Sequence, residues 1–259
     1  TGKIINIQLL TSGAGVRFGL RGPSSARLSP TLLVFADSLE ETLGNDYFLQ
    51  CGRKLFSEGY HCVSLDLPCH GQERREGEPA GLHGWRHRFD LGEDFLDEFI
   101  RRAIDVVDYL VSEQWADPHR IAVCGTSRGG FAAVHLLAEE PRLRCAAVMA
   151  PVTDLTVLEE FRSLSNTARA NALSLGHLAD RLAGRAVWIV IGDRDERVGT
   201  DRAISFARKL SVAAYEHQVT SRVELHVLPE PRGHTTPPGA AEAGARWIAR
   251  QLENSAAGC

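Results

Sequence analysis

The stretch that decides the fold is Ile121-Ala122-Val123-Cys124-Gly125-Thr126-Ser127-Arg128-Gly129-Gly130, followed by the helix-forming residues 131–138. It places the pattern G-x-S-x-G in a tight turn between an apolar strand and a helix. The turn forces Ser127 into a strained backbone conformation, and the two glycines remove side chains that would collide with the neighbouring strand and helix. This context favours a nucleophilic serine over a serine that only caps the helix.

Short apolar runs alternate with helical segments on both sides of this turn. Runs such as Leu32-Leu33-Val34-Phe35 are apolar throughout, which is typical of strands covered on both faces by helices. The predicted strands span residues 3–10, 16–22, 31–36, 61–66, 120–124, 145–150, 186–191 and 222–228. The predicted helices span residues 94–112, 128–139, 201–214 and 239–252. The alternation predicts an α/β fold with a mostly parallel sheet, preceded by an antiparallel hairpin that turns at residues 13–15.

A serine nucleophile needs a base, and the base needs an orienting carboxylate. Only one histidine after Ser127, His234, lies in a loop directly beyond the last predicted strand, where its imidazole can reach the sheet edge. The other four lie in predicted helices, after a helix or within a strand: His135, His177, His217 and His226. Elimination therefore indicates His234 as the base.

Two aspartates follow the apolar strand that ends at Ile191. Asp193 comes directly after Gly192 and is suited to stabilise the turn, which leaves Asp195 as the preferred carboxylate behind the base. Asp154 is the reserve candidate, and its alternative role is to cap the helix that begins at Leu155.

These residues together resemble the α/β-hydrolase superfamily over nearly the whole chain. The similarity rests on Gly125-Thr126-Ser127-Arg128-Gly129, on the segment from Gly192 to Val198, on Gly233-His234 and on Asp66-Leu67-Pro68-Cys69-His70-Gly71. The doubled glycine after the serine is similar to the prolyl-oligopeptidase-like and dienelactone-hydrolase-like branches. The resemblance implies one domain over residues 1–259, an eight-stranded sheet, a triad of Ser127, His234 and Asp195, and no metal or organic cofactor.

The chain departs from this superfamily after its third predicted strand. The usual His-Gly is replaced by Ala36-Asp37, which puts Ser38 at the position whose backbone N–H completes the oxyanion hole. The first donor is expected to be the backbone N–H of Arg128. Asp37 brings a carboxylate near a developing negative charge, so we expect it to point away or to be paired.

Two segments are expected at the mouth of the site. A short helical lid is predicted at about residues 152–185, and residues 77–92 are expected to form a loop that contributes a small rim or is an ordinary surface loop. A modest lid favours small or medium acyl groups. The arginines of this region either attract an anionic substrate or belong to a solvated face: Arg74, Arg75, Arg86 and Arg88.

The composition narrows the choice of partner and compartment. Lys and Arg number 29 against 33 Asp and Glu, a formal charge of -4, and no basic run offers a phosphate-binding stripe, so nucleic acid is not expected as a partner. No apolar run reaches the roughly 18 residues of a membrane span. The six cysteines form no C-x-x-C pair, and no charged-then-apolar leader is seen, so we expect a reducing, cytoplasmic compartment.

The sequence thus predicts a serine hydrolase that cleaves small carboxylic esters through an acyl-enzyme intermediate. A small serine peptidase or acyl-peptide hydrolase is the alternative enzyme, and a non-catalytic ligand-binding protein of the same fold is the alternative outside enzymes. The oligomeric state does not follow from the sequence.

Overall fold

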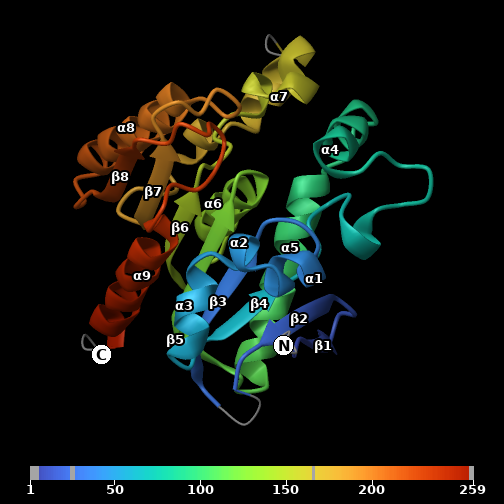
Figure 1. Cartoon of the computed structure of the whole chain (residues 1–259), viewed down its shortest axis with the longest axis vertical. Coiled ribbons are helices and arrows are strands. Elements are labelled where there is room, and N and C mark those ends of the chain that lie inside the picture. Colours follow the sequence, from blue (N-terminus) through green and yellow to red (C-terminus); the bar gives the residue numbers. More distant parts are fainter. Residues whose placement is uncertain (1–5, 24–26, 165–166, 257–259) are drawn as a thin grey trace.

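A computed structural model describes residues 6–23, 27–164 and 167–256 of the chain and builds them around one mixed sheet (Figure 1). The strands are β1 (Gln8–Thr11), β2 (Arg17–Arg21), β3 (Ser29–Phe35), β4 (His61–Ser64), β5 (Ala116–Thr126), β6 (Leu143–Met149), β7 (Ala186–Gly192) and β8 (Arg222–Leu228). Their order is β1-β2-β4-β3-β5-β6-β7-β8. Strands β1 and β2 pair antiparallel, β2 joins β4 antiparallel, and all further pairs are parallel. The predicted hairpin and eight-stranded sheet are confirmed, although residues 3–5 of the first predicted strand lie outside the described residues.

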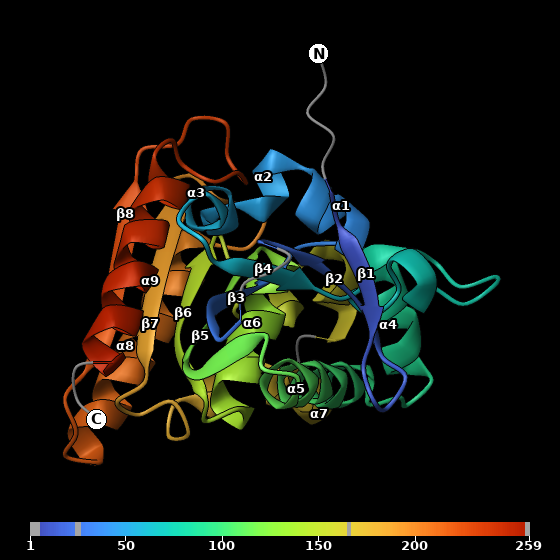
Figure 2. The same cartoon turned by 90° about the horizontal axis from the view of Figure 1, so that it is seen from below.

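Helices cover both faces of this sheet (Figure 2). They are α1 (Leu39–Gly44), α2 (Asp46–Leu49), α3 (Cys51–Ser57), α4 (Gly81–Asp90), α5 (Phe95–Ser112), α6 (Arg128–Glu139), α7 (Ala168–Ala172), α8 (Thr200–Glu216) and α9 (Ala240–Ala256). Short 3-10 helices are η1 (Gly71–Glu73), η2 (Leu155–Val157), η3 (Glu159–Leu164) and η4 (Leu175–Leu178). Helices α3 and α9 pack together on one face, and α5, α6 and α8 occupy the other.

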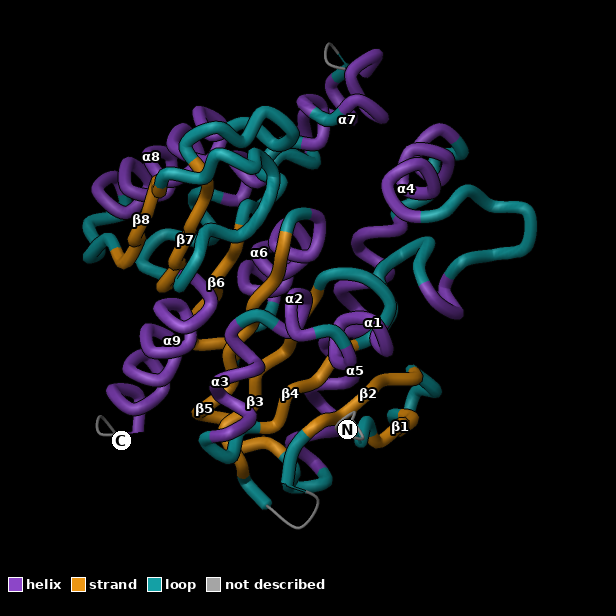
Figure 3. Tube along the Cα trace, viewed as in Figure 1, coloured by secondary structure: helices purple, strands orange, loops and turns teal. Residues whose placement is uncertain are grey.

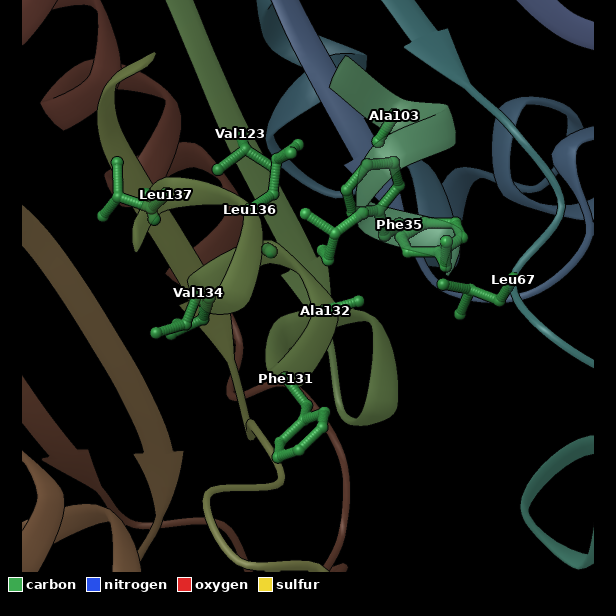
Figure 4. Packing of buried hydrophobic residues seen from close by; sticks show 14 of the residues in the cluster. Phe35, Leu67, Ala103, Val123, Phe131, Ala132, Val134, Leu136 and Leu137 are labelled. Carbon is green, nitrogen blue, oxygen red and sulfur yellow. The ribbon is translucent and has the colours of Figure 1, made fainter. Parts of the chain in front are cut away.

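The central strand β3 contributes side chains to the hydrophobic core on both faces of the sheet. Its alternate side chains point to opposite faces: Leu33 and Phe35 join the cluster under α5 and α6, while Leu32 and Val34 join the cluster under α3 and α9. Figure 4 shows Phe35 beside Ala103 of α5, close to the buried side of α6. The helix that begins after the predicted nucleophile therefore rests on a closely packed apolar surface.

The two glycines of the strand-to-helix turn have the packing role that the sequence predicts. A Cβ atom at Gly129 would lie 1.9 Å from the carbonyl oxygen of Phe35 in β3. A Cβ atom at Gly125 would lie 2.3 Å from the carbonyl oxygen of Gly129 in α6. Both distances are too short for any side chain, so α6 approaches the sheet this closely only because these positions are glycine.

The structure corrects the prediction for residues 77–92, which were expected to form a loop. Residues 81–90 are the helix α4, and Leu82, Trp85 and Phe89 on one side of it are buried. The indole Nε1–H of Trp85 donates to the carbonyl oxygen of Pro68 at 2.7 Å, which fastens α4 to the segment after β4. The amphipathic spacing was present in the sequence, but Gly81 and Gly84 weaken the helical signal.

The interval predicted as a lid contains only short helical turns in its described part: η2, η3, α7 and η4. Figure 3 shows α7 and α4 at the end of the molecule where the loops that follow the parallel strands lie. Across the described residues, no helix has both the length and the apolar character that crossing a membrane requires.

Candidate active site

Ser127 stands between β5 and α6 with φ 54° and ψ −119°, a conformation that residues other than glycine rarely adopt. Hydrogen bonds hold it there: its N–H donates to the carbonyl oxygen of Met149 at 3.0 Å, and its carbonyl oxygen accepts from the N–H of Val152 at 3.1 Å. This strained turn lifts the hydroxyl above the ends of β5 and β6. Strain of this kind persists only where the surrounding structure imposes it.

His234 reaches the serine from the loop after β8. Its Nε2 lies 3.0 Å from Oγ of Ser127, and its Nδ1 lies 2.8 Å from Oδ2 of Asp195. In the neutral imidazole, Nδ1–H donates to the carboxylate and Nε2 accepts from the serine hydroxyl, which is the arrangement that a general base requires.

Asp195 is buried, with 2% of its surface exposed. Its Oδ1 accepts from the N–H groups of Arg197 and Val198, each at 3.1 Å, while Oδ2 faces the imidazole. Both carboxylate oxygens are thus satisfied, and the side chain is fixed in the orientation that selects the tautomer of His234.

The reserve candidates lie elsewhere. Asp193 accepts from the N–H of Glu230 at 2.9 Å, which ties the loop after β7 to the loop after β8. Asp154 caps η2 by accepting from the N–H and the hydroxyl of Thr156. His226 on β8 packs against the ring of Trp188 on β7. The structure therefore brings together Ser127, His234 and Asp195, the combination that the sequence favoured.

The expected second oxyanion donor is engaged by another group. The N–H of Ser38 donates to Oδ1 of Asp37 at 2.8 Å. The N–H of Asp37 donates to Oγ1 of Thr42, and that of Leu39 donates to Oδ1 of Asp66 at 2.8 Å. The structure contradicts the prediction that Ser38 offers a free backbone donor, because the Asp37 side chain that replaces the usual glycine folds back onto this N–H.

Arg128 is the first residue of α6, so its backbone N–H lies at a helix N-terminus, where the macrodipole favours negative charge. Its guanidinium forms an ion pair with Oδ2 of Asp37 through Nη2. Burial lowers the pKa of Arg128, and Asp37 opposes this shift. The carboxylate expected near the oxyanion is therefore paired with a cation that follows the nucleophile directly.

His70 completes this polar group. Its Nδ1 lies 2.8 Å from the carbonyl oxygen of Pro68, and its Nε2 lies 3.8 Å from Oδ2 of Asp37. Burial, followed by the nearby positive charge of Arg128, lowers the pKa of His70. A neutral imidazole that donates through Nδ1 presents a lone pair at Nε2.

The loop that carries the base is fastened to the N-terminal part of the chain. Gln50 donates from its side-chain amide to Oγ1 of Thr236 at 2.8 Å. The hydroxyl of Tyr47 lies 3.1 Å from Oγ1 of Thr235 and accepts from the N–H of Thr236 at 3.4 Å. We call Tyr47 and Gln50 the loop clamp. It holds the two residues that directly follow His234.

The lid interval is joined to the loop that carries the carboxylate. Nη2 of Arg197 lies 2.6 and 2.8 Å from the two carboxylate oxygens of Glu160 in η3. Arg86 of α4 donates to the carbonyl oxygen of Glu160 and to the hydroxyl of Ser163. The lid is thus held from two sides.

The four arginines that the sequence offered as an anion-binding cluster have partners within the protein. Arg88 forms a bidentate pair with Glu78, and the two side chains are 3% and 4% exposed. Arg75 pairs with Glu93, and Arg74 donates to the carbonyl oxygen of Glu78. These contacts indicate a structural role rather than a substrate-binding patch.

Sequence reasoning missed the loop clamp and the ion pair between Glu160 and Arg197. It quoted His70 within the segment after β4 but assigned it no role. Only one local signal could have singled out His70, namely its place beside Gly71 just past a strand. The loop clamp has no local signal, because nothing in the sequence alone connects residues near 50 with residues near 235.

Comparisons with known proteins bear on the family and the fold. The prolyl oligopeptidase family matches residues 83–253. A Thermus thermophilus crystal structure is 22% identical with a TM-score of 0.72 and covers 97% of this chain and 99% of its own. An acetyl xylan esterase from a Paenibacillus species is 18% identical with a TM-score of 0.68, covering 96% of this chain and 89% of its own.

Peptidases are also among the similar structures. Porphyromonas gingivalis dipeptidyl peptidase 4 is 16% identical with a TM-score of 0.65 and covers 95% of this chain. This chain spans 35% of that protein's length. At these identities the structural similarities establish the α/β-hydrolase fold and leave the substrate open.

Proposed function

Because this chain belongs to the prolyl oligopeptidase family and is a serine hydrolase of the α/β-hydrolase type, we propose that it hydrolyses carboxylic esters of small to medium acyl groups. The proposal assigns Ser127 as nucleophile, His234 as base and Asp195 as the carboxylate that orients the base. The observation that carries it is the pair of contacts at His234, 3.0 Å to the serine and 2.8 Å to the carboxylate.

In the proposed reaction, His234 takes the hydroxyl proton as Oγ of Ser127 attacks the ester carbonyl carbon. The backbone N–H of Arg128 stabilises the oxyanion of the tetrahedral intermediate. His234 then gives its proton to the departing alkoxide, so that an alcohol leaves and an acyl-enzyme remains. A water molecule, deprotonated by the same imidazole, attacks the acyl carbon. The bond from that carbon to Oγ of Ser127 breaks, Oγ regains its proton from His234, and the carboxylic acid is released.

The short lid supports small or medium ester substrates. The interval from Pro151 to Arg185 holds only short helical turns in its described part, which leaves no large cap among these residues. We propose that the chain forms one catalytic domain with this interval as its insertion. We also propose a cytoplasmic location, which is supported by five buried cysteines that are all free thiols: Cys51, Cys62, Cys69, Cys124 and Cys145. Cys259 lies outside the described residues.

A small serine peptidase is the second candidate. The family match and the similarity to a dipeptidyl peptidase favour it. The same triad serves both reactions, so the substrate panel has to separate them.

Covalent labelling by a fluorophosphonate tests the nucleophile first. We expect the wild-type chain to be labelled and the Ser127→Ala variant to be unlabelled but folded, while the matched variant Ser57→Ala, changed on the exposed end of α3, is labelled like wild type. Failure of the wild-type chain to react would favour the non-catalytic ligand-binding protein.

A panel of p-nitrophenyl esters with graded acyl chains and of peptide amides then tests the substrate. We expect turnover of the acetyl and butyryl esters that exceeds turnover of the amides. His234→Ala should lower kcat by several orders of magnitude, as loss of a triad member does elsewhere. Faster cleavage of peptides than of esters would replace the esterase proposal with the peptidase.

A further inference from the structure

We propose that Asp37, His70 and Arg128 form a subsite beside Ser127 that binds a hydroxyl group of the substrate. The inference rests on the proposed function and narrows it: the substrates are esters whose alcohol or acid part carries a free hydroxyl near the ester bond, as in polyol and hydroxy-acid esters. We call these three residues the hydroxyl subsite.

Its position beside the nucleophile follows from the chain. Arg128 is the residue after Ser127, and its guanidinium turns to Oδ2 of Asp37 in the segment after β3. Nε2 of His70, from the segment after β4, lies 3.8 Å from the same oxygen. Three loops at the carboxyl ends of neighbouring parallel strands thus converge on one carboxylate oxygen.

Two buried polar atoms of this group have no hydrogen-bond partner among the described residues: Nε of Arg128 and Nε2 of His70. They are of opposite kinds, because the guanidinium Nε–H can only donate, whereas Nε2 of a neutral imidazole accepts. Buried groups of this kind are normally satisfied, and leaving both unpaired costs free energy. A hydroxyl group has both functions, and in the proposed subsite its oxygen accepts from Arg128 while its hydrogen is donated to His70.

The charges of the subsite favour a neutral ligand group. Oδ1 of Asp37 accepts from the N–H of Ser38, and Oδ2 accepts from the guanidinium of Arg128. The carboxylate and the guanidinium neutralise each other, so neither an anion nor a cation gains a full opposite charge here. Burial keeps the imidazole of His70 neutral by lowering its pKa.

The geometry also argues against a peptide group as the ligand. In a trans peptide unit the N–H and the C=O point to opposite sides. One peptide unit therefore does not present a donor and an acceptor at the same point, as a hydroxyl group does. The subsite is open to solvent on the side of Arg128 and Asp37, whose side chains are 22% and 29% exposed, while the His70 side chain, 6% exposed, forms its inner wall.

Pairs of esters that differ by one hydroxyl group test the proposal. 2-Hydroxypropyl butyrate is compared with propyl butyrate for a hydroxyl on the alcohol, and ethyl 3-hydroxybutyrate with ethyl butyrate for a hydroxyl on the acid. We expect kcat/KM to be about tenfold or more higher for the hydroxylated member of at least one pair, since a site built around a hydroxyl discriminates against its absence. Equal kcat/KM within both pairs would overturn the proposal.

Variants of His70 separate a hydroxyl contact from a merely structural effect. The amide of asparagine occupies the position of Nδ1, and the amide of glutamine reaches the position of Nε2. His70→Asn keeps a donor for Pro68 but removes the acceptor. In the ester pair that shows the preference, the ratio of kcat/KM for the hydroxylated ester to kcat/KM for the other ester should therefore fall toward one. His70→Gln should retain more of this ratio. The exposed variant His217→Asn on the far end of α8 is the control and should keep the wild-type ratio.

Arg128→Lys tests the donor. A lysine keeps the positive charge for Asp37 but lacks the Nε–H, so it should also lower the ratio. A wild-type ratio in both His70→Asn and Arg128→Lys would mean that water alone occupies the subsite and would overturn the inference. Fluorophosphonate labelling of Ser127 distinguishes this failure from failure of the esterase proposal, because labelling reports the nucleophile and its base and does not require a substrate hydroxyl.

Discussion

Gln50 donates from its buried side-chain amide to Oγ1 of Thr236 at 2.8 Å, and so joins the start of α3 to the loop that carries the base. Gln50 has a φ of 48°, in the left-handed region that non-glycine residues rarely adopt. A strained residue at the end of a long-range hydrogen bond indicates that the surrounding structure imposes its conformation.

The first prediction concerns this loop clamp. Tyr47→Phe removes one hydroxyl that contacts Thr235 and Thr236, and Gln50→Ala removes the amide donor. Both changes should loosen the position of the imidazole relative to Ser127 and lower kcat by about 3- to 30-fold with little change in KM, since misplacement of a catalytic group by a fraction of an ångström is costly. Steady-state kinetics on p-nitrophenyl acetate checks this.

The matched control for the tyrosine is Tyr215→Phe, because Tyr215 lies on α8 with 85% of its surface exposed. It should have wild-type kcat. If Tyr47→Phe and Gln50→Ala also retained wild-type kcat and wild-type rates of fluorophosphonate labelling, the clamp would have no role in positioning the base.

The second prediction concerns the approach of α6 to the sheet. Gly129→Ala places a methyl group 1.9 Å from the carbonyl oxygen of Phe35, so the helix has to move away from β3. We expect a loss of about 1–3 kcal/mol in the free energy of unfolding, the range for overpacked sites, and a loss of activity as Ser127 shifts. Urea unfolding measures the first effect. Gly44→Ala is the control, since no atom lies within 4 Å of its added Cβ, and equal stability of the two variants would contradict the argument.

The third prediction concerns the lid. Burial raises the pKa of Glu160, but the hydrogen bond and the charge of Arg197, together with a backbone hydrogen bond, outweigh burial and the net pKa is lowered. Arg197→Met leaves this carboxylate, 9% exposed, without its guanidinium. Proteolysis within residues 155–178 should become several-fold faster. Arg53→Met, which breaks the exposed pair with Glu242, should not change it; cleavage at the wild-type rate in Arg197→Met would show that other contacts hold the lid.

The fourth prediction concerns pH. Burial lowers the pKa of His135 in α6 from 6.5 to about 4, a shift that a hydrogen bond with the backbone of Leu173 only partly opposes. The unfolded chain therefore binds this proton more readily than the folded chain between these pH values. The contribution to stability is complete above about pH 6.5 and is lost as the pH falls toward 4, by about 2–3 kcal/mol.

Urea unfolding at pH 7 and pH 5 measures this effect. His135→Gln does not titrate, so its stability should fall less between the two pH values than that of the wild-type chain. His217→Gln, changed at an exposed position, should show the wild-type difference. An unchanged pH dependence in His135→Gln would assign the acid sensitivity to other groups.

The sheet and the group of Ser127, Asp195 and His234 could be predicted from the sequence because their signals are local. Apolar runs covered on both faces identify the central strands without any knowledge of their partners. Ser127 sits in a five-residue pattern, and Asp195 and His234 each follow a strand in a loop, so chain order and elimination were sufficient to select them. Each of these signals lies within about ten residues of the side chain it predicts.

The remaining features depend on contacts that a local pattern does not encode. The N–H of Ser38 is taken by the side chain of Asp37, which requires a particular rotamer. Helices α1, α2 and α3 are each too short for a clear apolar stripe and are held by the sheet and by α9. The loop clamp joins residues 186 positions apart. In each case tertiary packing, rather than propensity, determines the conformation.

The residues of the site come from widely separated parts of the chain, and this affects when activity can arise during synthesis. The loop clamp and Ser127 are synthesised long before β8 and the loop that carries His234. Until β8 joins β7, the nascent chain holds a serine that lacks its proton acceptor and is therefore a weak nucleophile. A ribosome-bound chain should thus be unable to attack cellular esters, and a nonsense mutation upstream of residue 234 should yield an inert fragment rather than an unregulated hydrolase.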